Sequence, residues 1–514
     1  MRDTAAMLQP TPPDAGRAAE PATPVAPFAF DNSYARELEG LYLPWRPAPV
    51  RAPRLLLLNA ALADELGVDA GALQGEVGAE LLGGNVLPEG ATPIAQAYAG
   101  HQFGGFSPQL GDGRAVLLGE VIDRFGARRD IALKGSGRTP FSRGGDGKAA
   151  LGPVLREYLM GEAMHALGVP TTRALAVVAT GEPVYREREL PGAVLTRVAA
   201  SHLRVGTFEF FAARGQKEEL RRLADYAIAR HDPELVGRAD RYLGLLEAVA
   251  RRQARLVAQW MNLGFIHGVM NTDNMTVSGE TIDYGPCAFI EAYDPATVFS
   301  SIDHGGRYAF GKQPGIARWN LARLADALLP LLADEPEAGL GLARPVIDAF
   351  VPWFEQAWRC GQRAKLGFGS EQPEDAALAD AWLALMQEQR LDFTLAWRHL
   401  ADAAEGRPAP LLDLVVDRDA LQSWLSRWAE RLQLEPQPAA ERAAAMRRAS
   451  PWLIPRNQRV EEALAAAVDR GDLNPFQRLL DALQRPWDEQ PGNADLAEPA
   501  PAELTARYQT FCGT

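Results

Sequence analysis

The chain has 514 residues, a length at which two or three packed subregions are expected. Hydrophobic residues make up 47% of it and charged residues 23%, as in globular proteins with a buried core. The formal net charge of −13 argues against a general nucleic-acid-binding protein but is compatible with a local basic site.

Location is indicated by cysteine usage and by the apolar runs. Cys287, Cys360 and Cys512 are too few and too scattered for a disulfide scaffold, which indicates a reducing compartment. The proline-rich N-terminus lacks the apolar stretch of a signal peptide and is predicted to be disordered. The richest apolar runs are about half the ~18 residues that would suggest a transmembrane helix. We therefore expect a soluble, cytoplasmic protein with no membrane partner.

Elements can be predicted in chain order. Helical periodicity alternates with short turns over 28–90, and strand-like apolar runs follow. These runs lie at 115–123, 130–135, 174–180 and 192–198, with one helix at 151–168. The pattern then predicts amphipathic helices over 217–263, a β-hairpin over 275–282, and helices almost throughout from about residue 314.

This order favours an α+β fold with a mixed N-terminal lobe and a helical C-terminal lobe over a doubly wound sheet. The predicted regions are a disordered tail, an N-terminal lobe with glycine-rich segments, a helical lobe with a metal-binding loop, and a C-terminal tail. Their boundaries are 1–27, 28–205, 206–485 and 486–514.

Two glycine-rich segments could hold phosphate. QLGDGRA contains Gly111, Gly113 and Arg114, and KGSGRTPFSRGGDGKAA spans 134–150. Neither has the spacing of a Walker A loop or of a dinucleotide-binding fingerprint. Surface turns are the alternative, but six basic residues in this part of an acidic protein favour anion binding: Arg114, Lys134, Arg138, Arg143, Lys148 and Arg156.

A third segment has the residue order of a protein-kinase catalytic loop. HGVMNTDN at 267–274 and the later Asp283-Tyr284-Gly285 correspond to H-R-D-x-x-x-x-N and D-F-G. Asn274 and Asp283 are therefore candidate ligands for Mg²⁺, with Mn²⁺ as the alternative. Val269 takes the position of the kinase base. Asp273 could act as a base or as a water-mediated metal ligand, or it could only form an Asx turn.

Lys134 and Glu157 extend the kinase-like order. Lys134 ends the apolar run DIAL, and Glu157 follows inside the predicted helix, where a kinase has its strand lysine and helix glutamate. An ion pair between them would hold Lys134 toward a nucleotide phosphate. Taken alone, an ordinary strand-end lysine and a surface glutamate explain the two residues better. Chance is a poor explanation for the complete order of motifs.

QLGDGRA, LKGSGRTPFSRGGDGKAALGP, HGVMNTDN, TIDYGPCAF and the C-terminal cysteine together resemble the selenoprotein O family over nearly all of the chain beyond its tail. The resemblance implies a bilobal, protein-kinase-like fold. It further implies transfer of AMP from ATP to protein hydroxyls, with the nucleotide reversed relative to its orientation in kinases. Some members use UTP.

The resemblance also implies roles for individual residues. The implied nucleotide contacts are Gly111, Gly113, Arg114, Lys134, Asp146, Gly147, Arg197, Arg204 and Asp283. Asn274 and Asp283 would bind the metal, and Asp273 would accept a proton. Eukaryotic members carry selenocysteine near the C-terminus, where this chain has Cys512, so any redox role would rest on sulfur.

A reversed nucleotide would explain why Val269 stands in the place of the base. The β- and γ-phosphates would lie deep in the site and leave as pyrophosphate, whose charge calls for buried cations such as Arg114, Arg197 and Arg204. A conventional protein kinase and an inactive nucleotide-binding scaffold are the alternatives. Val269 argues against the kinase, and the retention of both metal ligands argues against the scaffold.

Cys287 lies beside the metal-ligand loop and is the candidate disulfide partner of Cys512, because chain ends are mobile enough to reach another thiol. For this pair we favour the simpler interpretation, in which all three thiols stay unpaired in a reducing cytosol.

Overall fold

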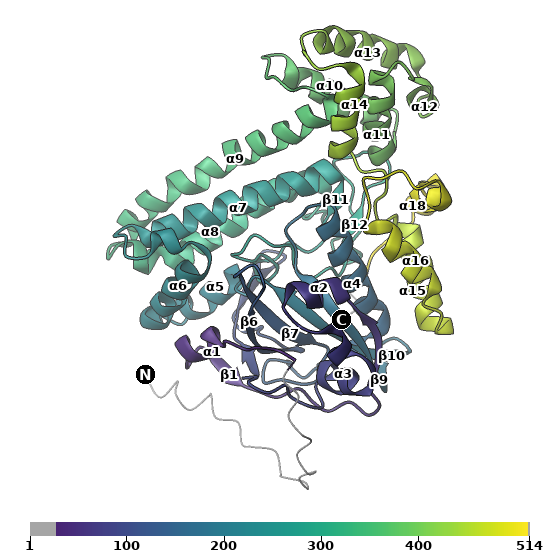
Figure 1. The fold of residues 1–514 in the computed structure, drawn as a ribbon. Coiled ribbons are helices and arrows are strands. Elements are labelled where there is room, and N and C mark those ends of the chain that lie inside the picture. Colours follow the sequence, from purple (N-terminus) through teal and green to yellow (C-terminus); the bar gives the residue numbers. More distant parts are fainter. Residues whose placement is uncertain (1–26, 512–514) are drawn as a thin grey trace.

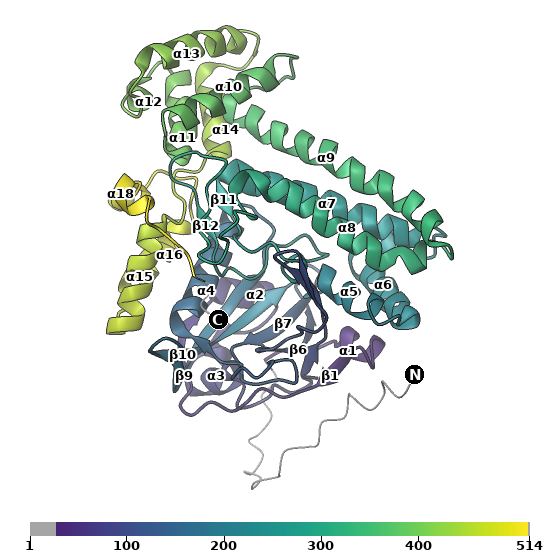
Figure 2. The same ribbon diagram turned by 180° about the vertical axis from the view of Figure 1, so that it is seen from behind.

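The computed structural model describes residues 27–511, so the predicted N-terminal tail lies almost entirely outside the described residues and Cys512 lies wholly outside them. Within this range a sheet with a few helices forms the N-terminal part, and helices form most of the remainder (Figures 1 and 2). The predicted α+β fold with a mixed N-terminal lobe and a helical C-terminal lobe is confirmed.

An eight-stranded antiparallel sheet organises the N-terminal lobe. The strand order is β1-β3-β6-β7-β10-β9-β2, and the short β8 pairs with β10. The bounds are β1 (Tyr42–Pro44), β2 (Arg54–Leu58), β3 (Ile94–Gln96), β6 (Ala115–Ile122), β7 (Arg128–Lys134), β8 (Ala149–Ala150), β9 (Arg173–Tyr185) and β10 (Glu189–Ala199). All four predicted strands are present, as β6, β7, β9 and β10.

Helices cover both faces of this sheet, which explains why its central strands read as continuous apolar runs instead of alternating ones. On one face, Leu133 of β7 and Val194 of β10 pack against α2 (Ala60–Glu65) and α3 (Gly75–Gly83). On the other face, Leu195 packs with residues of α4 (Leu151–Ala166). Helix α1 (Ser33–Glu37) and the small β4 (Gly100–Gln102) and β5 (Gly105–Ser107) hairpin complete this lobe.

Helix α4 joins the two lobes. It ends close to the predicted stop, with Gly168 in the left-handed region at φ 78°. Its outer side packs against α15 (Asn457–Arg470) and α16 (Asn474–Leu483), where the rings of Tyr158 and Phe476 lie 6.4 Å apart. Helices from the end of the chain therefore complete a core begun by the N-terminal lobe.

The helical lobe is built around three long helices, α7, α8 and α9, which lie side by side in both views (Figures 1 and 2). No helix in residues 27–511 is long and apolar enough to cross a membrane. The bounds are α5 (Val205–Ala212), α6 (Lys217–His231), α7 (Arg241–Leu263), α8 (Gln313–Leu332), α9 (Pro336–Leu366), α10 (Asp375–Glu388), α11 (Phe393–Ala404), α12 (Ala409–Leu412), α13 (Arg418–Leu432), α14 (Ala439–Ala449), α17 (Ala494–Ala497) and α18 (Ala502–Thr505), with the strand pair β11 (Phe265–Ile266) and β12 (Ala288–Phe289).

The predicted β-hairpin over 275–282 is wrong. Thr276 instead forms an isolated bridge with Arg204, and Thr281 forms one with Thr171, so each end of the segment pairs with a different part of the chain. Side chains of α7 also hold the segment, because Gln253 donates to the carbonyl of Thr276 at 2.7 Å. These long-range contacts satisfy the backbone that a hairpin would have paired locally.

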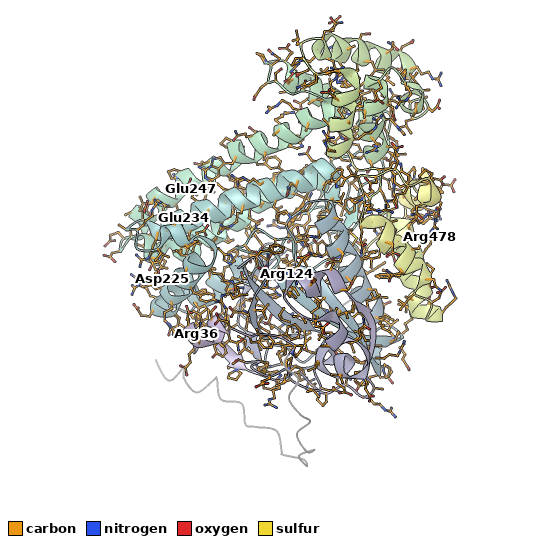
Figure 3. The ribbon with its side chains drawn as sticks, viewed as in Figure 1. Arg36, Arg124, Asp225, Glu234, Glu247 and Arg478 are labelled. Atoms are coloured by element: carbon orange, nitrogen blue, oxygen red, sulfur yellow. The ribbon has the colours of Figure 1, made fainter. Side chains whose placement is uncertain are left out.

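Exposed charges of both signs are distributed over many elements. Figure 3 labels examples on separate helices and loops: Arg36, Arg124, Asp225, Glu234, Glu247 and Arg478. Several of them take part in exposed ion pairs, such as Arg124 with Asp64. Pairs of this kind contribute little to stability, about 0–1 kcal/mol each.

Lys365 of α9 is an exception, since it is buried and has no carboxylate partner among residues 27–511. The residue is only 3% exposed, and its Nζ donates to the carbonyl of Asn262. Nζ also lies 5.2 Å from the ring centroid of Phe393 and 5.1 Å from that of Trp397. Burial lowers the pKa of Lys365 to about 7. The unfolded chain therefore binds more protons than the folded chain between about pH 7 and the ordinary lysine pKa, and this residue makes stability rise with pH across that window.

We expect the Lys365→Met variant to lose this rise, because it has no group to titrate there. Its free energy of unfolding relative to the wild type should be highest at pH 7 and should decline toward pH 10, by up to about 1.4 kcal/mol per pH unit in the steepest part. Thermal unfolding at four pH values measures the difference. The same pH dependence in both proteins would show that Lys365 stays charged in the fold.

Candidate active site

A cavity of about 1250 Å³ lies between the sheet and the helical lobe. Its walls come from β6, β7, β10 and α4 on one side and from the loop after β11 on the other. All of the residues predicted to contact nucleotide or metal line it, as do the predicted proton acceptor Asp273 and the predicted ion-pair partner Glu157: Gly111, Gly113, Arg114, Lys134, Asp146, Gly147, Glu157, Arg197, Arg204, Asp273, Asn274 and Asp283. Residues far apart in the sequence thus meet in one place.

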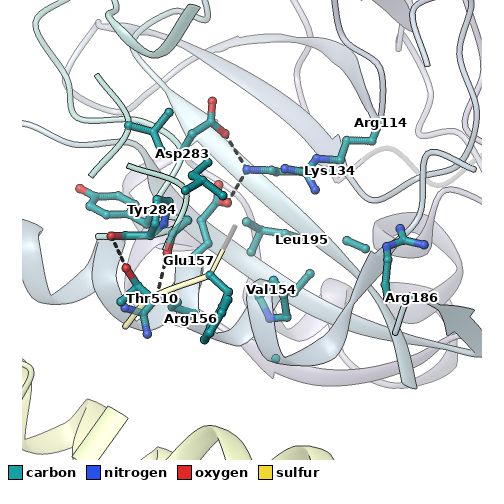
Figure 4. A pocket seen from close by; sticks show the side chains of 18 of the residues that line it. Arg114, Lys134, Val154, Arg156, Glu157, Arg186, Leu195, Asp283, Tyr284 and Thr510 are labelled. Atoms are coloured by element: carbon teal, nitrogen blue, oxygen red, sulfur yellow. Dashed lines mark hydrogen bonds and ion pairs between the residues drawn. The ribbon is translucent and has the colours of Figure 1, made fainter. Parts of the chain in front are cut away.

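Lys134 lies at the centre of the sheet, at the end of β7, opposite Ala115 of β6 and Leu195 of β10. Its Nζ is 2.5 Å from Glu157 Oε2 and 2.6 Å from Asp283 Oδ1 (Figure 4). The helix glutamate therefore draws the strand lysine into the cavity, which is the arrangement of a protein-kinase nucleotide site.

Asp283 forms ion pairs with three cationic side chains. Besides Lys134, Arg197 Nη1 lies 2.7 Å from Oδ1 and Arg204 Nη1 lies 3.0 Å from Oδ2. Burial raises the pKa of Asp283, but the three cations outweigh burial and hold that pKa well below its usual range. With Glu157 included, three positive charges face two negative ones, so the cluster carries a net positive charge that suits an anionic ligand.

The backbone at Asp283 is strained. Its φ of 62° lies in the left-handed region, where residues other than glycine are uncommon. Tyr284 anchors the turn, because its hydroxyl hydrogen-bonds to that of Thr171 inside the core, and Arg156 Nε donates to the carbonyl of Gly285 at 3.1 Å. Strain of this kind persists where surrounding contacts fix it, and it aims the carboxylate into the cavity.

Asp273 lies in η4 (Thr272–Asn274), a single turn of 3₁₀-helix, and its Oδ2 accepts from Gln102 Nε2 of β4 at 3.3 Å. Its other carboxylate oxygen is buried and has no hydrogen-bond partner within residues 27–511. A side chain on Gly100 would place its Cβ 2.6 Å from that oxygen, so glycine is needed there. Burial raises the pKa of Asp273 to about 6 against the opposing effect of Arg204.

The donor set fits a magnesium–nucleotide complex. Asn274 donates its Nδ2 to the carbonyl of Val269 at 3.0 Å, which commits the amide nitrogen and leaves the amide oxygen for a ligand. Together with Asp283 and the unpartnered oxygen of Asp273 it supplies hard oxygen donors, as Mg²⁺ requires. In the described part of the chain no three His, Cys, Asp or Glu side chains form a metal site by themselves, so phosphates would have to complete it.

The glycine-rich segments form the opposite wall and pack at backbone contact distance. A Cβ on Gly113 would lie 2.9 Å from the carbonyl oxygen of Phe141, and one on Gly147 would lie 2.0 Å from that of Gly137. Asp146 pairs with Arg186 at 2.9 Å and accepts from the amide of Lys148. The side chain of Arg114 faces the cavity (Figure 4) and forms no ion pair with any residue of 27–511.

Val269, at the position of the kinase base, is only 7% exposed and lines the cavity with an apolar side chain. It cannot exchange a proton. Its carbonyl orients Asn274, so the residue serves the geometry of the loop and not a proton transfer.

Cys287 is fully buried, and burial raises the pKa of its thiol to about 11. The last described residues run nearby, since Thr510 Oγ1 donates to the carbonyl of Pro286 at 2.7 Å (Figure 4). Because Cys512 lies outside the described residues, its pairing with Cys287 stays a prediction.

Sequence reasoning missed Gln102 and His202. Gln102 reaches Asp273 only because the β4–β5 hairpin folds over the loop that carries it, and no local pattern signals that contact. His202, in SHLRVG, lies between Arg197 and Arg204 in the sequence. Its position between two residues predicted to contact the nucleotide was the signal that could have identified it.

Comparison with known proteins decides the family. The sequence pattern of the family described as protein adenylyltransferase SelO matches residues 25–484. The chain belongs to the SelO family. Its membership makes it a protein nucleotidyltransferase, confirms the predicted enzyme class, and implies ATP as a substrate.

Curated SelO-family relatives named protein nucleotidyltransferase YdiU are similar over almost the whole chain. One from Cereibacter sphaeroides is 62% identical over 488 residues, which are 95% of this chain and 100% of that protein. One from Chromobacterium violaceum is 61% identical over 475 residues, 92% of this chain and 99% of that protein. One from Rhizobium meliloti is 58% identical over 489 residues, which are 95% of this chain and 99% of that protein.

Among solved structures, the chain is similar to ROP2 from Toxoplasma gondii, described as a virulence factor with a protein-kinase fold and no enzymatic activity. The identity is 13% and the TM-score 0.22, over 66% of this chain and 88% of that one.

Proposed function

We propose that the protein transfers AMP from ATP to Ser, Thr or Tyr hydroxyls of other proteins and releases pyrophosphate. The observation that carries this proposal is the convergence of Lys134, Arg197 and Arg204 on Asp283, beside an apolar Val269 where a kinase has its base. In the reaction, the acceptor oxygen bonds to the α-phosphorus, the bond from that phosphorus to the bridging oxygen breaks, and pyrophosphate leaves.

The buried cations would stabilise the leaving group. Pyrophosphate carries more charge than the transferred AMP, and charge-assisted hydrogen bonds from Lys134, Arg197 and Arg204 would hold it most strongly as its charge develops. Arg114, free of ion pairs within 27–511, is a fourth cation in the same cavity. A reversed nucleotide places the β- and γ-phosphates against this cluster and leaves the α-phosphate toward Asp273.

Asn274 and Asp283 would hold Mg²⁺, or Mn²⁺ as the alternative, together with the phosphates. The ion supplies charge neutralisation when it is bound. Asp273, with one unpartnered carboxylate oxygen, would accept the proton of the acceptor hydroxyl; holding a second metal is its alternative role. Transfer of UMP from UTP is the same reaction with another base.

We place the protein in the cytoplasm, in agreement with the scarcity of cysteine.

Replacing Lys134 should damage the reaction more than replacing Asp273. Phosphoryl-group chemistry depends mainly on positioning and charge neutralisation, so we expect Lys134→Ala to lower kcat/KM on the order of 10²-fold and Asp273→Ala on the order of tenfold. The measurement is pyrophosphate release with an acceptor-protein mixture, checked by intact-mass spectrometry for one added AMP per event. A larger loss in Asp273→Ala would make proton transfer the dominant contribution.

A further inference from the structure

Arg197 reaches the cavity from β10 with only one of its nitrogens on the acidic cluster. Nη1 lies 2.7 Å from Asp283 Oδ1 and 3.2 Å from Glu157 Oε1. No residue of 27–511 accepts a hydrogen bond from Nη2, so that nitrogen is available to a ligand. Because the guanidinium is planar, fixing Nε and Nη1 also fixes the direction in which Nη2 points.

His202 supplies the contact at Nε. Arg197 Nε donates to His202 Nε2 at 3.2 Å, and the two residues are 2% and 4% exposed, so this contact is shielded from bulk solvent. His202 is held in turn by Asp130 of β7, whose Oδ2 lies 2.9 Å from Nδ1 and accepts from the His202 amide at 2.8 Å. Arg230 of α6 fixes the other oxygen of Asp130 at 2.6 Å.

Hydrogen-bond chemistry determines the proton positions in this chain of contacts. A guanidinium can only donate, so His202 Nε2 must be unprotonated and Nδ1 must donate to Asp130. A neutral imidazole agrees with its surroundings, because burial, reinforced by Arg197, lowers the pKa of His202 to about 4 against the opposing effect of its hydrogen bond to Asp130.

We propose that His202, oriented by Asp130, is a positioning residue that sets the plane of the Arg197 guanidinium for the phosphates of the bound nucleotide. The proposal rests on the proposed function to the extent that the nucleotide occupies this cavity. The Asp130–His202 pair has a structural role, because it connects β7 to the loop before α5. The proposal adds a second role for this pair, in nucleotide binding.

Two amide variants separate positioning from structural support. His202→Asn retains a donor near Nδ1 for Asp130 but has no atom at Nε2. His202→Gln can place its amide oxygen near Nε2, where it accepts from Arg197. Each is made in the wild type and in Arg197→Lys, whose side chain has no Nε. We measure the dissociation constant of a non-hydrolysable ATP analogue with Mg²⁺, the KM for ATP, kcat, and the thermal midpoint.

We expect His202→Asn to weaken binding of the analogue about tenfold and to raise the KM for ATP with a smaller effect on kcat, since one contact to a charged group is lost. His202→Gln should bind within about twofold of the wild type, and His202→Asn should add no loss in the Arg197→Lys background. Three results would overturn the proposal. They are an equal loss of affinity in His202→Asn and His202→Gln, a loss of affinity from His202→Asn that is as large in the Arg197→Lys background as in the wild type, and binding by His202→Asn at the wild-type affinity.

His202→Leu fills the same space without a hydrogen-bonding atom and replaces His202→Asn if that variant does not fold. Binding of the analogue does not depend on which phosphate is later transferred. If the protein did not transfer AMP, the binding titration would therefore still test the role of His202, and the transfer assay would show the failure of the proposed function on its own.

Discussion

Asp283→Ala is expected to lower kcat/KM by about 10³-fold or more. The substitution removes the one carboxylate among the proposed metal ligands that also contacts Lys134, Arg197 and Arg204, and it leaves these three buried cations without their shared partner. Nucleotide binding should lose its dependence on Mg²⁺. Initial rates at saturating Mg²⁺ and titrations with and without the metal measure the two effects.

Two further variants keep this expectation testable. Asp283→Asn preserves the shape of the side chain and removes its charge, so it should lose activity similarly even if Asp283→Ala folds poorly. Asp64→Ala removes an exposed carboxylate, 65% accessible in its ion pair with Arg124, and should leave the rate unchanged. Near wild-type turnover by Asp283→Ala would show that the metal site lies elsewhere.

Gly147→Ala is expected to weaken nucleotide binding about 10²-fold, because its Cβ would lie 2.0 Å from the Gly137 carbonyl oxygen and 2.6 Å from the Arg138 amide nitrogen. Both obstacles are backbone atoms, so the glycine-rich wall would have to move. The left-handed φ of 67° adds strain.

Gly144→Ala is the matched control in the same loop. Its φ of 86° is equally left-handed, but a Cβ there meets no atom within 4 Å, so it should cost only about 1 kcal/mol of strain and should bind nucleotide almost normally. Titration of a non-hydrolysable ATP analogue compares the pair. Equal affinities would mean that backbone spacing in this wall does not control binding.

Local patterns were sufficient for much of the fold. β6, β7 and α4 follow from apolar runs bounded by glycine, and the stop at Gly168 follows from the chemistry of helix ends. The kinase-like residue order also indicated an ion pair between Lys134 and Glu157, which the strand β7 and the helix α4 bring together.

Contacts between distant segments were not predictable in this way. Residues 275–282 have hairpin chemistry, yet they pair with Arg204 and Thr171 because the fold brings those partners alongside. The packing of Phe476 against Tyr158 and the contact of Gln102 with Asp273 also join segments by tertiary geometry. No spacing within one segment encodes such contacts, although the residue types that make them can be recognised.

ATP labelled separately at the α- and γ-phosphates tests the central claim most directly. The protein is incubated with Mg²⁺ and a protein extract, with Asp283→Asn as the inactive control, and label bound to protein is counted after the nucleotide is removed. AMP transfer predicts label on protein from the α-position alone. Label from the γ-position would make the protein a kinase and would contradict the reversed nucleotide, and absence of label from either position would favour a scaffold.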